Sequence, residues 1–367
     1  FQAEDGIRDS STSRGLGDVY KRQGIKPGNP IDMVVSKTDP NTVFVNNYGG
    51  GVFKTEDGGK TWVDWSNGYS GANILGLSVS RSGCLAANGR SQMHLSGDFG
   101  ETWQGILYGK SYGLGDGLAI KFLSHDDSNQ TIIATDANSG DLYYSNNLGK
   151  DWESATGLID IEHSLFEESF GIHIVEEATS NPMVLYAGYI QSKIKGQDPH
   201  QLDEIEQSPG MYKSIDGGMS WFPINNGLPD KEYSRNISDI AVSKQNENIV
   251  YINSLFDGLY YTVDGGESWS HLKGDLPAGM SWDDCGHTCV NEEGERIDME
   301  DMEPSEMILR KHAMSVAVNP QNDQEIFLGT NVHGVYKSID GGVSWEETLW
   351  RTVAIKTSKR DLSLIHI

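Results

Sequence analysis

Aspartates are the residues in this sequence whose spacing could support chemistry, because one recurs at the same position of a repeated octet. The octet reads Ser/Thr-x-Asp-x-Gly-x-Thr/Ser-Trp, as at Thr55–Trp62, and occurs six times. Aspartates that met in one cavity could transfer protons or bind cations. A short carboxylate can instead accept hydrogen bonds from backbone N–H groups a few residues ahead and close a tight turn. Six equivalent copies favour this structural role.

The other octet positions fit a turn that enters a strand. Glycine supplies a positive φ at low cost, and the tryptophan can bury its ring between neighbouring sheets. The third copy has Asn147 for the aspartate and Asp151 for the second hydroxyl, which predicts a weaker turn that still forms. The residues with these structural roles are Asp57, Asp98, Asn147, Asp216, Asp264 and Asp340, with Trp62, Trp103, Trp152, Trp221, Trp269 and Trp345.

Outside the octets, candidate chemistry rests on single residues. Asp116 and Asp257 are the candidates for acid–base catalysis, since two carboxylates across a cleft can serve as acid and base. No motif fixes this pair. Polar and aromatic side chains that could face a ligand, with the aromatic rings as flat platforms for sugars, are Tyr48, Arg90, Glu167, Trp282 and His333.

Two cysteines, Cys285 and Cys289, flank His287 in a third kind of cluster. Zinc would need a fourth ligand, which the sequence does not supply, so we expect no metal and no cofactor. A local disulfide between Cys285 and Cys289 is favoured if the protein is exported.

The elements that position these residues are short strands. Residues 32–36, 239–243 and 315–319 match as a first strand, and each lies 30 residues before the tryptophan of an octet. Two further apolar runs precede the octet and one follows it. Period-two alternation with frequent turn signals predicts four antiparallel strands per unit and an all-β propeller of six blades, with almost no helix. A seventh blade remains open if the chain continues.

The predicted connections divide between two faces of the disc. Counting strands A to D outward from the axis, the A–B turns and the octets fall on one face. The B–C and D–A connections, including the long segments 154–171, 191–210 and 270–311, fall on the other. Loops vary in length where a rigid scaffold presents function, so we expect the ligand site on this loop-rich face.

The octet resembles the Asp box of the sialidase-like and sortilin-like propellers, and six copies extend the resemblance over most of the chain. It implies four functions: exo-sialidase, xyloglucanase-type glycoside hydrolase, sortilin-like peptide receptor and photosystem-assembly factor. Sialidase relatives need an Arg-Ile-Pro segment and an arginine triad. The first is absent, and no arginine spacing marks the second. We expect a peptide- or glycan-binding or scaffold propeller, with a glycoside hydrolase as the alternative.

Charge and chain ends bound the remaining expectations. The 367 residues carry a net charge of −25, which disfavours nucleic acid and anionic membranes as partners. No apolar run is long enough to insert into a membrane. Residues 1–23 and 361–367 resemble translated sequencing-adapter sequence, so the propeller is assigned to 24–360. We expect a monomer that works outside the cell or in a periplasm.

Overall fold

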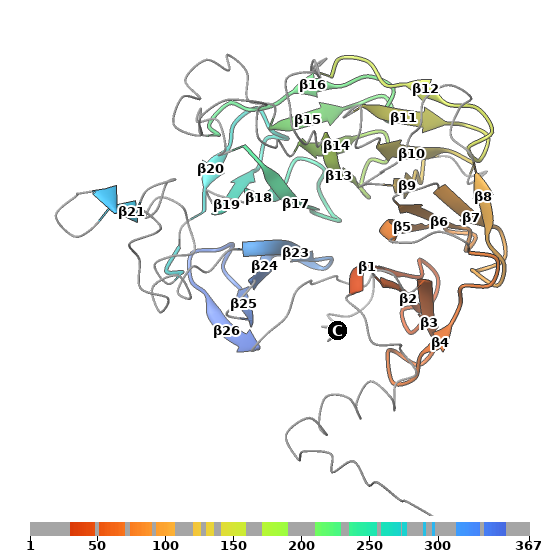
Figure 1. Cartoon of the computed structure of the whole chain (residues 1–367). Coiled ribbons are helices and arrows are strands. Elements are labelled where there is room, and N and C mark those ends of the chain that lie inside the picture. Colours follow the sequence, from red (N-terminus) through yellow and green to blue (C-terminus); the bar gives the residue numbers. More distant parts are fainter. Residues whose placement is uncertain are drawn as a thin grey trace, which may run out of the picture.

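The computed structural model shows a ring of β-sheets (Figure 1). Among the residues it describes there is no helix, and hence none that could cross a bilayer. The structure describes residues 30–47, 51–69, 74–89, 93–106, 120–125, 130–135, 141–158, 171–189, 210–228, 235–254, 258–272, 274–276, 289–290, 296–297, 313–330 and 334–349.

Six sheets of four antiparallel strands form the blades. Blade 1 contains β1 (Pro30–Val35), β2 (Val43–Asn47), β3 (Gly51–Thr55) and β4 (Val63–Asp64). Blade 2 contains β5 (Ile74–Val79), β6 (Leu85–Gly89), β7 (Met93–Ser96) and β8 (Gln104–Ile106). Blade 3 contains β9 (Ile120–Phe122), β10 (Ile132–Thr135), β11 (Leu142–Ser145) and β12 (Glu153–Ser154).

The second half of the chain repeats this plan. Blade 4 contains β13 (Ile172–Glu177), β14 (Leu185–Tyr189), β15 (Met211–Ser214) and β16 (Phe222–Pro223). Blade 5 contains β17 (Ile237–Val242), β18 (Val250–Ser254), β19 (Gly258–Thr262) and β20 (Ser270–His271). A small hairpin, β21 (Cys289–Val290) and β22 (Arg296–Ile297), precedes blade 6, which contains β23 (Ala313–Asn319), β24 (Asn322–Thr330), β25 (Gly334–Ser338) and β26 (Glu346–Leu349).

The first strand of each blade lies innermost, and the blades follow one another around the axis (Figure 1). The sequence prediction of six four-stranded antiparallel blades is therefore confirmed. A register shift interrupts the first strand pairing in five blades, all except blade 3. At this bulge Asp32 accepts a hydrogen bond from Leu77 N of the next blade at 3.0 Å, and Asp239 accepts one from Val316 N at 2.9 Å. Bulged inner strands thus join neighbouring blades.

The core lies between blades rather than within them. One cluster combines Tyr186, Met211 and Ile224 of blade 4 with Ile252 and the octet tryptophan of blade 5. Equivalent shared clusters join blades 1 and 2, 2 and 3, 3 and 4, and 5 and 6. Because each sheet packs against its neighbours, the second and third strands are buried along most of their length, polar residues such as Lys54 and His94 included.

Each octet closes a turn between the third and fourth strands. In the first copy, Asp57 accepts hydrogen bonds from the Thr55 hydroxyl at 2.7 Å, from Thr61 N at 2.9 Å and from the Thr61 hydroxyl at 2.6 Å. The Thr55 hydroxyl oxygen also accepts a bond from Gly59 N at 3.0 Å. The tryptophan lies one residue before the fourth strand, and its ring is buried in four of the six copies.

The third octet forms the same turn with exchanged groups. Asn147 accepts bonds from the Ser145 hydroxyl at 3.0 Å and from Asp151 N at 2.9 Å. Its amide Nδ2 then donates to the Asp151 carboxylate at 2.9 Å. In the other copies a hydroxyl at the later position donates to the aspartate. Donor and acceptor have therefore changed places while the turn is retained.

A second repeated turn follows the fourth strand and contacts the next octet. Asn67 O accepts a hydrogen bond from Trp103 N at 2.9 Å, and Asn226 O accepts one from Trp269 N at 2.9 Å. The glycine that follows, Gly68 or Gly227, has a positive φ of 82° or 90° and packs on the tryptophan backbone. Thr156 and Gly157 make the same contact with blade 4. These turns connect the outer parts of neighbouring blades.

Candidate functional site

The residues predicted for the loop-rich face lie outside the described part of the chain. The strand ends that flank them are described, and antiparallel order places those ends on the face opposite the octets. For example, β2 ends at Asn47 and β3 begins at Gly51 on either side of residue 48. The predictions that fall outside the described residues are Tyr48, Arg90, Asp116, Glu167, Asp257, Trp282, Cys285 and His333. Cys289 begins β21, but its side chain is likewise not described, so the disulfide stays a prediction.

The octet aspartates do not meet in one cavity. Each accepts hydrogen bonds from within its own turn, and these bonds hold the pKa of Asp57, Asp264 and Asp340 at about 2. The largest cause in each case is the hydroxyl of the later Ser or Thr of the octet. Such carboxylates are poor proton donors at neutral pH. In the described part of the chain, no group of three His, Cys, Asp or Glu side chains could hold a metal ion.

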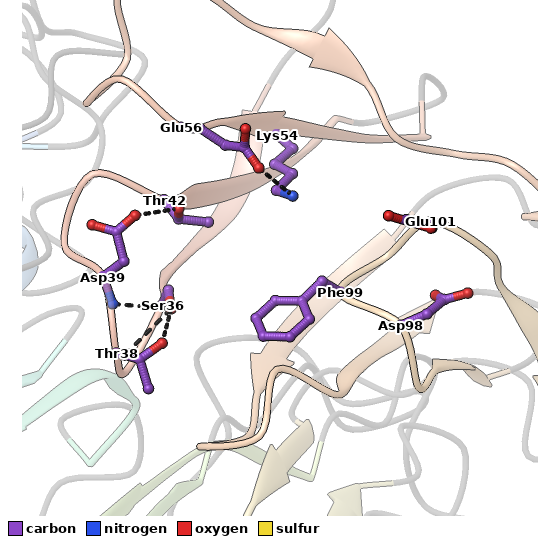
Figure 2. Close-up of a pocket in the computed structure, with 9 residues that line it drawn as sticks. All are labelled: Ser36, Thr38, Asp39, Thr42, Lys54, Glu56, Asp98, Phe99 and Glu101. Carbon is purple, nitrogen blue, oxygen red and sulfur yellow. Dashed lines mark hydrogen bonds and ion pairs between the residues drawn. The ribbon is translucent and has the colours of Figure 1, made fainter.

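A cleft of about 460 Å³ opens on the octet face between blades 1 and 2 (Figure 2). Blade 1 contributes its first turn, between β1 and β2, and the end of β3. Blade 2 contributes its octet. The lining residues are Ser36, Thr38, Asp39, Thr42, Lys54, Glu56, Asp98, Phe99 and Glu101. In Figure 2 the turn that holds Asp39 faces the octet that holds Phe99, and Lys54 lies between them.

Lys54 is the cation of this cleft, and its charge is already engaged. Its side chain is 8% exposed and its Nζ lies 2.7 Å from the Glu56 carboxylate. The Nζ also lies 4.5 Å from the centre of the Trp65 ring and 5.8 Å from that of Phe44. Aromatic faces attract a cation electrostatically, so Lys54 is held against the wall of the cleft.

Phe99 supplies the apolar wall. Its φ is 57°, a left-handed conformation that residues other than glycine seldom adopt. Four octets have glycine at this position, and Leu148 is the other exception, also at 57°. The Phe99 ring covers Gly83, where a Cβ would come within 2.0 Å of it, and the residue remains 39% exposed. A large apolar side chain is therefore kept partly in solvent by a strained backbone.

The remaining lining is polar and acidic. The Thr42 hydroxyl donates to Asp39 at 2.7 Å and lowers the pKa of that carboxyl. Asp98 is occupied by its own turn, and the Thr102 hydroxyl at 2.5 Å lowers its pKa. Glu101 is exposed beside it. Carboxylates thus outnumber the single lysine around the cleft.

Sequence reasoning missed this cleft because it directed attention to the opposite face. Two signals were present in the sequence. One is Phe99 at an octet position that elsewhere is mostly glycine. The other is the short turn before β6, where Ser80 N donates to Cys84 O. Cys84 itself is half-buried and free.

Comparison with known proteins agrees with the fold. The family described as BNR/Asp-box repeat matches residues 260–271, within the fifth octet and its flanks. With six such turns in six blades, the protein is an Asp-box β-propeller. No curated protein matches the sequence.

Several solved structures share the fold at low identity. The GH74 xyloglucanase from Xanthomonas campestris has a TM-score of 0.62 at 16% identity, covering 89% of this chain and 46% of its own. An ancestral GH74 enzyme has a TM-score of 0.59 at 17% identity, covering 86% and 37%. YCF48 bound to D1 peptide has a TM-score of 0.55 at 16% identity, covering 89% and 82%. This chain therefore spans less than half of either GH74 enzyme and most of YCF48.

Proposed function

We propose that this propeller is a binding protein that engages a peptide or glycan through the face opposite the octets. The observation that supports it is the division between the two faces. Octets of one design close the outer turns of the first face, and their carboxylates are used within those turns. The strand ends that flank the long connections lie on the other face. A rigid scaffold with variable loops on one side is the usual arrangement for recognition.

The comparisons support both ligand classes, since they include a peptide-bound propeller and glycan-acting enzymes. YCF48, which was solved with a D1 peptide, matches this chain over most of both lengths. The GH74 enzymes match over less than half of their own length, and glycoside hydrolysis is kept as the alternative function. We further propose that the protein acts outside the cell or in a periplasm, as a monomer.

The test combines binding with turnover. We expect the protein to bind members of a peptide or glycan array, and to release no reducing sugar from xyloglucan. Alanine at Tyr48, Arg90 or His333 should weaken array binding. Glu267→Lys, in an octet on the other face, is the matched control and should bind normally. Xyloglucan hydrolysis that is lost in Asp116→Asn or Asp257→Asn, with folding retained, would establish the enzyme instead.

A further inference from the structure

The cleft between blades 1 and 2 is a feature that the proposed function does not use, because it lies on the octet face. We propose that it is a second binding site, which takes a lysine or arginine side chain of an extended peptide. The proposal is independent of the ligand on the opposite face. It rests on how the cleft arises, on its apolar wall and on its charge.

The first turn of blade 2 is shorter than its equivalents, which leaves space above it. In blade 2 the turn is closed by a bond from Ser80 N to Cys84 O. In blades 1 and 5 the corresponding bonds run from Ser36 N to Thr42 O and from Ser243 N to Ile249 O. The blade 2 turn therefore contains two residues fewer. Phe99 lies over this turn and fills only part of the space.

This junction also lacks a cross-blade bond that the second strand makes in blades 4 and 5. Strand pairing makes Phe44 of blade 1 equivalent to Tyr186 of blade 4 and Tyr251 of blade 5. Tyr186 OH donates to Glu247 O of blade 5 at 2.7 Å, and Tyr251 OH donates to Asp323 O of blade 6 at 3.3 Å. Phe44 has no hydroxyl, so it cannot make this bond to blade 2.

The cleft has room for one long side chain. Ligand pockets usually have volumes from about 300 to 1,000 Å³, and this cleft has about 460 Å³. The exposed Phe99 ring can cover the methylene stem of a lysine or arginine, and its face can attract the cation. The Thr38 hydroxyl lines the opposite wall and can accept a hydrogen bond, whereas Ser36 Oγ already accepts bonds from Thr38 N and Asp39 N at 3.3 Å (Figure 2).

The charges select a cation. Asp39, Glu56, Asp98 and Glu101 surround the cleft, and the one lysine among the lining residues is paired with Glu56. Asp39 is kept ionised by its bonds from Thr42 and Asn41, and Glu101 extends from the other wall. A carboxylate or phosphate ligand would face net repulsion here. A neutral sugar could stack on Phe99 but would gain nothing from the acidic rim.

The direct experiment compares two blocked tripeptides, Gly-Arg-Gly and the same peptide with citrulline in place of arginine. Citrulline keeps the shape of the side chain and removes its charge. Saturation-transfer NMR and titration should show binding of the arginine peptide at least about tenfold tighter than of the citrulline peptide, since hydrogen bonds to charged groups are stronger. Binding should weaken as NaCl is raised from 0.05 to 0.5 M, as an exposed charge pair requires.

Two variants locate the site without disturbing the fold. Phe99→Gly installs the residue found at this position in four octets, and Glu101→Lys installs the residue found as Lys60 and Lys150. Each variant should weaken the binding of the arginine peptide at least fivefold. The matched controls are Leu148→Gly and Glu267→Lys, at equivalent positions away from the cleft, and both should bind normally.

Three results would overturn the proposal. The first is equal affinity for the citrulline peptide, and the second is equal loss in the control variants. The third is unchanged binding in both Phe99→Gly and Glu101→Lys. Thermal melting of each variant shows that it is folded. Because the readout is a defined cationic peptide, failure here leaves the array binding proposed for the other face intact.

Discussion

The junction between blades 1 and 2 and the junction between blades 4 and 5 have cores of the same kind. They differ at the rim, which is the edge of the junction on the octet face. Both bury an octet tryptophan and apolar strand residues between the sheets. At the rim of blades 4 and 5, Lys213 Nζ donates to Gly265 O at 2.9 Å, alongside the bond from Tyr186. At the rim of blades 1 and 2, Lys54 pairs with Glu56 of its own blade, and a cleft remains.

This difference separates the contacts that hold the ring together from the contacts that can vary between junctions. The shared clusters and the turns at Gly68 and Gly227 occur at both junctions. The bonds from Lys213 and Tyr186 occur only at blades 4 and 5, whereas at blades 1 and 2 Trp65 Nε1 donates to Phe99 O at 2.7 Å. Rim contacts can therefore be exchanged for a ligand cleft without loss of the buried area that stabilises the ring.

The largest expected effect tests the part common to both junctions. A Cβ at Gly227 would lie 2.2 Å from Trp269 O, and one at Gly68 would lie 2.6 Å from Trp103 O. Gly227→Ala and Gly68→Ala should each lower the free energy of unfolding by about 3 kcal/mol or more, from the positive φ together with the clash. Denaturant unfolding measures this. Gly97→Ala, with nothing within 4 Å, is the control and should change little.

The next effect separates the two rims. Tyr186→Phe removes a buried hydroxyl and leaves Glu247 O without that donor, which should cost about 1–2 kcal/mol. Phe44→Tyr adds a hydroxyl to a fully buried ring and should cost about 1–3 kcal/mol. A gain of stability in Phe44→Tyr would show that the hydroxyl finds an acceptor across the junction and that the two rims are not different.

A smaller effect concerns the strained octet positions. Phe99→Gly relieves a left-handed φ, and the gain of about 1 kcal/mol is partly offset by lost contact with Gly83. Leu148→Gly relieves the same strain but loses packing against the cluster of blades 2 and 3. Thermal melting should therefore rank Phe99→Gly above Leu148→Gly. The reverse order would indicate that Phe99 contributes more to stability by packing than its backbone strain costs.

The smallest effect is the acid sensitivity of a single octet. The folded-state pKa of Asp264 is about 2, below its ordinary value, so its stabilising effect is present above pH 4 and is lost as pH falls toward 2. Asp264→Asn should flatten the decline of the unfolding free energy between pH 4 and pH 2. Asn147→Asp places two carboxylates together at Asp151, so it should lower the unfolding free energy at neutral pH and lose that penalty as the pH falls. An unchanged pH profile in Asp264→Asn would contradict the assignment.

The sequence was sufficient for the fold because the octet and the strand pattern recur. Asp57 and Trp62 could be assigned a turn and a core position because five similar copies constrain them. The cleft was not predicted, since it depends on the absence of two residues before Cys84 and on Phe44 standing where blades 4 and 5 have tyrosine. Both can be read from the sequence, but they point to a cleft only when strand register aligns the blades and brings these residues together. The candidates on the other face depend on long connections without a repeat, and there neither periodicity nor turn chemistry fixes a conformation.

The exchanged groups of the third octet show which single replacements such a turn can tolerate. In an octet that pairs an aspartate with a later hydroxyl, replacing only the hydroxyl residue by aspartate brings two anions together. Replacement of the first aspartate alone by asparagine sets an amide donor against a hydroxyl, which can still accept its hydrogen. Asparagine at the first position is therefore compatible with either partner, whereas aspartate at the second position requires a donor such as Asn147 opposite it.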